Sequence, residues 1–170
     1  ATNHVVGEGK GAKSISNRLT VALSIDTTAA AKASFGTART MLKSIKDDEG
    51  RPLNLKGTLL VVPPALEDIA NALMTNDKLE DGKPNPYKGT AKVLVCGWLE
   101  TDTEWHLLDT SKAVKPIIFQ PRKKPVFVQQ TDTSSDAVFM RKKFKFGAEA
   151  RAAGGYGFWQ LAYGSDGSVA

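Results

Sequence analysis

Cysteine and histidine are scarce in this chain. The 170 residues contain one cysteine, Cys96, and two histidines, His4 and His106. A single cysteine excludes an internal disulfide and any zinc site that needs several cysteines. Cys96 lies in the apolar run 93–96, which predicts a buried structural thiol. Two isolated histidines do not supply the neighbouring groups that a metal site or a nucleophile–base pair requires, so we expect no metal, no cofactor and no catalytic residue.

Long apolar runs are also absent. No stretch of about 18 apolar residues occurs, so we expect no membrane-spanning helix. The first residues, Ala1 to His4, lack the charged start and apolar run that are typical of a signal peptide. Hydrophobic residues make up 41% of the chain and charged residues 24%, a balance typical of a globular protein. At this length we expect one domain with a core of its own.

Motifs for binding phosphates or cations are missing as well. Lys10 lies between Gly9 and Gly11, whereas a P-loop needs Ser or Thr after its lysine. The glycines within residues 154–157 do not have the dinucleotide-binding spacing, and they predict a tight turn between strands. The acidic run 47–49 predicts a solvated helix end, because consecutive residues rarely converge on one ion. No motif positions a nucleophile or a base for a hydrolase, so we expect a protein that is not an enzyme.

Positive charge is in modest excess, with a formal net charge of +5 and a pI near 9.3. We interpret it as spread along the chain and as serving solubility, although a basic protein also invites a nucleic-acid-binding interpretation. Two clusters are candidate contact residues: Arg122, Lys123 and Lys124, and Arg141 with Lys142. Neither has a helix-turn-helix, a zinc finger or an aromatic stacking platform beside it. The alternatives are a solvated strand edge that lysine protects against mispairing, or contacts with DNA phosphates or with an acidic loop of a neighbouring subunit.

Helices are predicted in the first half of the chain. Residues 1–25 hold few large apolar groups and predict a flexible N-terminal arm, with a short strand at 19–25. Apolar residues at helical spacing predict a helix over 28–46. The apolar run 59–62 predicts a buried strand, and the two prolines that follow it open a second helix over 64–74.

The second half is rich in strand-forming residues. Residues 75–90 are polar and turn-rich, which predicts an exposed loop of the kind that often carries contacts between molecules. A strand is predicted over 138–150, because apolar residues alternate with mostly charged ones from Lys143 onward, which is typical of an antiparallel strand with one solvated face. Strands are predicted near 91–96, 104–109, 115–119, 125–130, 138–150 and 156–163.

This order of elements predicts an α+β protein, with two main helices packed on antiparallel or mixed β-sheets. We expect one α+β domain over 26–164, whose β-rich part is 91–163, and a C-terminal tail over 165–170. Trp98, Trp105 and Trp159 are interpreted first as core anchors and second as anchors of contacts with other proteins, where tryptophan is enriched.

Several stretches, in their order along the chain, resemble one family. They are PLNLK (52–56) with LVVPPALE (60–67), NPYKGTA (85–91), WL (98–99) with WHLLD (105–109), KPIIFQ (115–120), and the segment 150–164, which ends in GGYGFWQLAYG. On these stretches the chain is similar to the C-terminal portion of the major head subunit of Mu-like phages and prophages, the gene product T family. The resemblance covers most of residues 50–164, and residues 1–49 match only loosely.

The resemblance implies the tailed-phage major-capsid fold, a shell-forming α+β fold with a peripheral and an axial region. It implies assembly into hexamers and pentamers around packaged double-stranded DNA, with the virion capsid as the location and the host bacterial cytoplasm as the place of assembly. Implied partners are other copies of the chain, scaffold, protease and portal proteins, and packaged DNA, which is contacted nonspecifically. Subunits of this family are longer, so we expect this chain to be a fragment trimmed near its N-terminus.

One alternative from another class remains open. A basic, β-rich module that binds nucleic acid would use the same lysine and arginine clusters. Its affinity for DNA would fall steeply with salt, which distinguishes it from a shell protein.

Overall fold

The computed structural model describes residues 3–6, 13–16, 18–23, 28–47, 49–79, 82–132 and 136–169. The chain divides into two compact units. The first, here called the body, comprises Ala1–Pro116 and Gly157–Ala170. The second, here called the ribbon, comprises Ile117–Tyr156. The ribbon is therefore an insertion between two segments that belong to the body.

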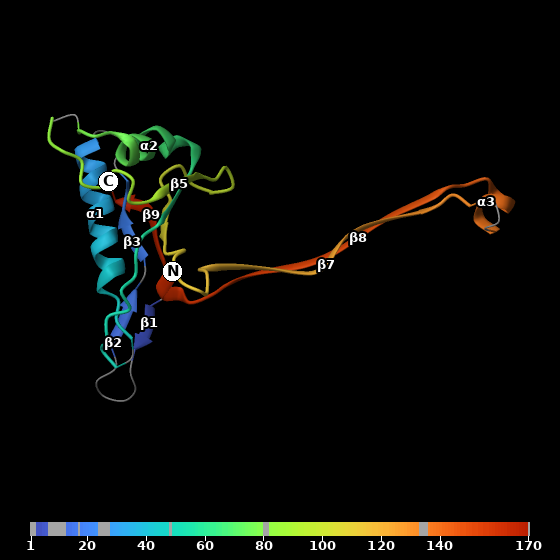
Figure 1. Ribbon diagram of the computed structural model, residues 1–170, viewed down its shortest axis with the longest axis horizontal. Coiled ribbons are helices and arrows are strands. Elements are labelled where there is room, and N and C mark those ends of the chain that lie inside the picture. The colour runs from blue at the N-terminus through green and yellow to red at the C-terminus, as the bar shows by residue number, and fades with distance from the viewer. Residues whose placement is uncertain are drawn as a thin grey trace. The chain divides into compact units, whose positions relative to one another are not determined.

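A five-stranded mixed sheet forms the centre of the body, with the strand order β3-β9-β6-β4-β5 (Figure 1). Strands β4 and β5 are parallel, as are β3 and β9, whereas β6 runs antiparallel to both β4 and β9. The bounds are β3 Arg18–Val21, β4 Leu59–Val62, β5 Lys92–Val95, β6 Trp105–Leu108 and β9 Ala162–Val169. A separate antiparallel pair consists of β1 Asn3–Val6 and β2 Lys13–Ser16.

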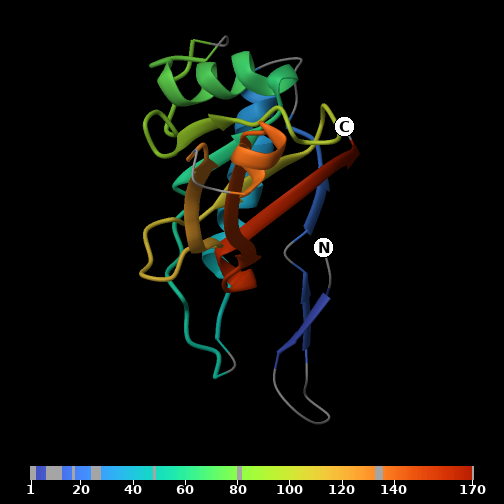
Figure 2. The same ribbon diagram turned by 90° about the vertical axis from the view of Figure 1, so that its right-hand side faces the viewer.

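Two helices pack against this sheet. Helix α1, Thr28–Ser44, lies behind the sheet in the view of Figure 2. It buries Ala31, Phe35, Ala38 and Leu42, which recur every three to four residues and so share one face. Helix α2, Glu67–Thr75, follows a 3₁₀ turn, Pro64–Leu66, in which proline occupies the first turn, where its missing N–H costs nothing. Glu67 and Asp68 lie in the first turn of α2, at the positive end of its dipole.

The core lies between the two helices and the sheet. Trp105, which is only 1% exposed, is among its largest side chains and confirms the prediction of a core anchor at this position. Facing residues of neighbouring strands, such as Leu60 and Leu107, are paired in register and buried together. Removing these aliphatic and aromatic surfaces from water is the main stabilising term of the body.

Asp109 is a buried carboxylate at the end of β6. Its Oδ2 accepts a hydrogen bond from the Lys56 backbone N–H at 2.8 Å, and its Oδ1 accepts from the backbone N–H and the hydroxyl of Ser111 at 2.8 and 2.6 Å. Burial by itself raises the pKa of this carboxyl, but the hydrogen bonds from Ser111 and Lys56 outweigh it and hold the pKa below its ordinary value. Asp109 therefore ties the end of β6 to the segment that precedes β4.

The ribbon consists of two long antiparallel strands, β7 Ile117–Gln130 and β8 Lys145–Tyr156, joined through the short helix α3, Asp136–Arg141 (Figure 1). Their register is interrupted between Pro121 and Lys123 and again between Lys123 and Val126. Pro121 and Pro125 lie at these interruptions, because proline has no N–H to contribute to a strand ladder. Every residue of both strands is exposed.

The α+β class and the two main helices are confirmed, as are the strands predicted at 59–62, 91–96 and 104–109. The strands predicted near 115–119 and 125–130 are parts of one strand, β7. The strand predicted over 138–150 is wrong in its first part, where α3 and an irregular segment stand, because these residues do not alternate. The strand predicted over 156–163 is wrong too: a 3₁₀ turn at Trp159–Leu161 precedes β9.

Three local interpretations also need correction. Every residue of strand β8 is exposed, so the strand lacks the buried face that was predicted for it. Gly154 and Gly155 lie inside β8, paired with Phe119 and Ile118, and do not form a turn. Cys96 is half-buried, since it follows the edge strand β5 and is not in the core.

The predicted division into arm, domain and tail stays a prediction. Of residues 1–25, the described ones include β1, β2 and β3, and β3 pairs with β9. Residues 165–169, assigned to the tail, are the second part of β9. Gly9, Lys10 and Gly11 lie outside the described residues.

Candidate functional site

Within the described ranges, no group of three or more His, Cys, Asp and Glu residues is placed to hold a metal ion. His106 lies on β6, where its Nε2 is 3.0 Å from Glu104 Oε1. No helix among the described residues is long and apolar enough to cross a membrane. Exposed surfaces of the body and of the ribbon are the candidate sites.

Two residues of the acidic run 47–49, Asp47 and Glu49, are bound by Arg51. The carboxylate of Asp47 accepts hydrogen bonds from the backbone N–H and from Nε of Arg51, at 2.7 and 2.8 Å. Glu49 pairs with the same guanidinium at 2.8 Å. The side-chain hydrogen bond from Arg51 is the largest cause that lowers the pKa of Asp47. These two acidic side chains therefore stabilise a surface turn after α1.

The whole positive excess of the chain lies on the ribbon. Residues 117–156 contain eight Lys and Arg against three Asp and Glu, a formal charge of +5. The remaining residues contain fifteen of each sign, so the body has no net charge. The interpretation of an excess spread along the chain is therefore wrong, because the division into two units separates a neutral part from a strongly basic one.

All five predicted contact residues lie on the ribbon, in two separate places. Arg122, Lys123 and Lys124 lie in the middle of β7, whereas Arg141 ends α3 and Lys142 follows it. About 20 Å of extended strand separates Lys124 from the end of β7, so the structure does not bring the two clusters together.

The cluster on β7 is partly neutralised by its neighbours. The ammonium of Lys123 forms an ion pair with Glu149 on β8. Arg151 Nε lies 3.5 Å from the other oxygen of the same carboxylate. One acid is thus shared by two cations, which leaves net positive charge on this part of the ribbon.

Apolar side chains accompany this charge along the ribbon. The rings of Phe127 and Phe146 stack across the two strands with centroids 6.0 Å apart, yet both residues remain exposed. Further exposed apolar residues are Ile117, Ile118, Phe119, Val126, Val128, Phe139, Met140, Phe144 and Tyr156. A two-stranded ribbon without a core is marginally stable in water, and exposed apolar surface of this extent marks a contact with another protein surface.

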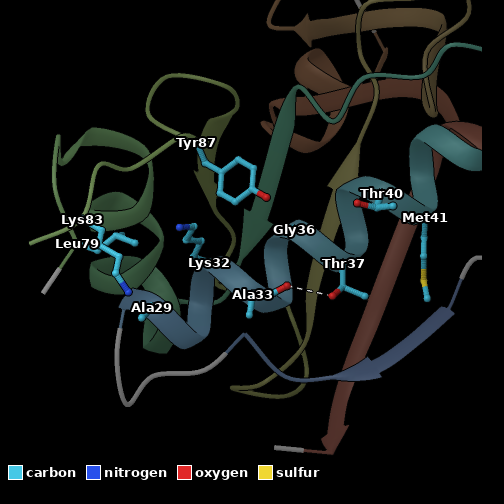
Figure 3. A pocket seen from close by; sticks show the side chains of 10 residues that line it. All are labelled: Ala29, Lys32, Ala33, Gly36, Thr37, Thr40, Met41, Leu79, Lys83 and Tyr87. Carbon is cyan, nitrogen blue, oxygen red and sulfur yellow. Dashed lines mark hydrogen bonds between the residues drawn. The ribbon is translucent and has the colours of Figure 1, made fainter. Parts of the chain in front are cut away.

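A groove lies along the outer side of α1 in the body and has a volume of about 670 Å³. Small residues such as Ala33, Gly36 and Thr37 form its floor, and Tyr87 stands across from Gly36 (Figure 3). A Cβ at Gly36 would lie 2.7 Å from the Tyr87 hydroxyl oxygen, so glycine permits this close approach. The Arg39 guanidinium lies 5.6 Å from the centre of the Tyr87 ring. The groove is part of how the 82–90 segment packs on α1.

Trp98 is a surface residue, which corrects its interpretation as a core anchor. It is 93% exposed and lies in the loop after β5, an edge strand of the sheet. Leu94 on β5 is exposed beside this loop, and Glu100 and Asp102 follow Trp98 in it. The signal in the sequence was the polar, acidic composition of the residues that follow Trp98, which is typical of a surface loop.

These observations define an α+β protein with an ordered body and exposed contact surfaces. The family model described as "Mu-like prophage major head subunit gpT" matches residues 22–99 and 100–170. The chain belongs to the Mu-like major head subunit family.

Two curated relatives agree with this assignment. Over 65 residues the chain is 52% identical to the major capsid protein of Escherichia phage Mu and 46% identical to the Mu-like prophage FluMu major head subunit of Haemophilus influenzae. Each alignment covers 38% of this chain and 21% of the relative, so the matched segment spans about a fifth of those proteins.

A solved structure, the procapsid of bacteriophage JBD30, shares 30% sequence identity with the chain. The alignment covers 59% of this chain and 38% of the procapsid chain, with a TM-score of 0.32.

Proposed function

We propose that the chain is part of a major capsid subunit that assembles, with other copies of itself, into the icosahedral head of a Mu-like phage or prophage. The observation that carries the proposal is the family match, which runs from residue 22 to residue 170. The role is structural, and the subunit encloses double-stranded DNA in the virion after assembly in the bacterial cytoplasm. Scaffold, protease and portal proteins are its further partners in this proposal.

The physical properties of the two units support a structural role in a capsid. The body has a continuous core and can hold contact surfaces in fixed positions. The ribbon exposes apolar and basic residues along its whole length. Contacts that are weak one at a time become strong when they repeat in a closed symmetric array.

The test is expression of the complete open reading frame that contains this chain, together with the other head genes of the same phage, followed by electron microscopy. We expect closed shells that contain the chain. Particles without the chain, or a protein that sediments only as a monomer under these conditions, would contradict the proposal. Omission of the reading frame is the matched control, and it should abolish the shells.

The nucleic-acid-binding module is not favoured, because the family match concerns head subunits. The basic ribbon is compatible with nonspecific contact to packaged DNA, since lysine and arginine neutralise phosphates and release counterions. That contact is a further part of this proposal.

A further inference from the structure

Two exposed surfaces of this chain are complementary in charge. We call residues 139–144 the basic tip and residues 98–104 the acidic loop. The tip combines three exposed apolar side chains with positive charges, and the loop combines the exposed Trp98 with negative charges. They belong to different units, since the tip lies on the ribbon and the loop lies on the body.

The basic tip has the composition of an unpartnered contact. Phe139 and Met140 are 75% and 77% exposed, and Phe144 is exposed as well. Arg141, Lys142 and Lys143 lie between them in the sequence, and no ion pair of these three is found within the described residues.

The backbone of the tip is held at one point. The Lys142 N–H donates to the carbonyl oxygen of Val138 at 2.9 Å, and Val138 is buried. Lys142 itself adopts a left-handed conformation with φ of 48°, which ends the helix. The exposed residues are therefore displayed by a defined turn at the end of α3.

The acidic loop is held at both ends, which makes it a pre-formed surface. At its start, the Leu99 N–H donates to the Cys96 carbonyl at 3.5 Å. At its end, the Thr103 hydroxyl donates to the carbonyl of Asp166 in β9 at 3.2 Å, and a Cβ at Gly167 would lie 2.4 Å from the Thr103 carbonyl oxygen. Trp98 is nevertheless almost fully exposed, and a pre-formed loop loses little conformational entropy on binding.

The strand beside the loop is open as well. Strand β5 is the last strand of the sheet order, so only one of its edges is paired within the described structure. Leu94 and Val95 are exposed on it, next in the chain to the loop that carries Trp98. An open edge with apolar neighbours is a feature that proteins usually cover.

We propose that the acidic loop of one copy of this chain binds the basic tip of a second copy. Glu100 and Asp102 face Arg141, Lys142 and Lys143 in this contact, and Trp98 packs against the apolar residues of the tip. The charges select the partner and orient it, whereas the buried aromatic and apolar surfaces supply most of the affinity. This inference rests on the proposed function, because it specifies one contact of the assembly.

A second copy fits this surface better than DNA does. DNA would neutralise the cations of the tip but would leave Phe139, Met140 and Phe144 in water. The acidic loop, with Trp98 at its start, would repel DNA. The contact joins two different surfaces, so it is heterologous and propagates into rings or larger arrays, as a shell requires.

The experiment uses charge reversal with rescue in the full 170-residue chain. The loop variant is Glu100→Lys with Asp102→Lys, and the tip variant is Arg141→Glu with Lys142→Glu. Sedimentation velocity at low salt measures self-association, because screening weakens exposed charge pairs at high salt. We expect wild-type chain to self-associate and each variant to associate at least about tenfold more weakly, a difference of about 1.4 kcal/mol.

Rescue separates a specific contact from a general loss of folding. The chain with all four substitutions should regain association, and an equimolar mixture of the two variants should associate although each alone does not. Trp98→Ala should also weaken association while the urea midpoint stays unchanged, because the side chain is exposed. Glu67→Lys with Asp68→Lys on α2 is the control for the same change of charge elsewhere on the body.

Several results would overturn the contact. One is a wild-type chain that stays monomeric up to about 1 mM. Another is a loop or tip variant that associates as strongly as wild type. A third is a chain with all four substitutions that associates no more strongly than the loop variant or the tip variant alone. A tip variant that loses only DNA binding would assign the tip to nucleic acid. If shells still form from the complete reading frame in any of these cases, the proposed function stands and only this contact fails.

Discussion

At the scale of single residues, Asp109 is a fully buried polar side chain of the body. Its carboxylate is buried and accepts three hydrogen bonds, from Lys56 and from two groups of Ser111. A buried acceptor of this kind stabilises the folded state chiefly because its loss leaves buried donors without a partner. The same hydrogen bonds favour the ionised carboxylate, and they hold the pKa of Asp109 below its ordinary value although burial raises it.

We predict that Asp109→Asn lowers the free energy of unfolding by about 2 kcal/mol at pH 7, measured by urea denaturation. The folded pKa lies below the unfolded one, so the contribution of Asp109 is present above about pH 4 and is lost as the pH falls through the folded pKa. The difference between wild type and variant should therefore shrink in acid. Asp102→Asn, at an exposed position, is the control, and an equal loss from both substitutions would refute the assignment.

Trp98 and Trp105 show why the burial of a single side chain is hard to predict from sequence. Both are tryptophans in the β-rich half, yet Trp105 is fully buried and Trp98 is almost fully exposed. Residue type alone predicts the same core role for both. Exposure is decided by the sheet: β6 lies between β4 and β9, whereas Trp98 follows the edge strand β5.

At the scale of elements, α1 and the strands of the ribbon differ in the burial of their apolar residues. Helix α1 has one apolar face at helical spacing, and this face was predictable because the pattern is local. Strands β7 and β8 also carry apolar residues, but they lie in a two-stranded unit in which every residue is exposed. The length of β7 was not predictable, because two prolines split its sequence into segments that look like separate strands.

We predict that Phe127→Ser with Phe146→Ser weakens self-association and leaves the stability of the body unchanged. These rings stack on each other at the surface of the ribbon, so they are free to contact another copy and do not belong to the body's core. Sedimentation velocity measures the association, and urea denaturation followed by tryptophan fluorescence measures the body.

Leu42→Ala is the contrasting substitution for this experiment. Leu42 is fully buried on α1, and its truncation should cost about 2–5 kcal/mol of body stability. A ribbon variant that unfolds the body as Leu42→Ala does would contradict the division into two units.

At the scale of the whole molecule, the division into two units is also a division of charge. The body is neutral and the ribbon carries +5, so the two units differ in solubility and in the partners they attract. The family assignment and the predicted α+β class hold for the chain.

We predict that limited digestion with trypsin cuts the ribbon before the body. The ribbon contains exposed lysines and arginines on strands that no core protects, whereas cleavage in the sheet and helices of the body requires unfolding. Mass spectrometry of the early fragments should locate the first cuts within residues 117–156. Assembly should protect these sites, and early cuts within α1 or β6 instead would refute the prediction.

The sequence by itself determined the scarcity of catalytic side chains, the two main helices, the strands β4, β5 and β6 and the family resemblance, because these depend on residue types and on local spacing. Only the tertiary structure decided which apolar residues are covered. Strands β4, β6 and β9 pair across long stretches of sequence and bury Trp105, whereas strands β7 and β8 form a two-stranded sheet of their own. Burial is a property of such long-range pairing, so the aromatic residues of the ribbon are exposed although their local sequences resemble those of buried strands.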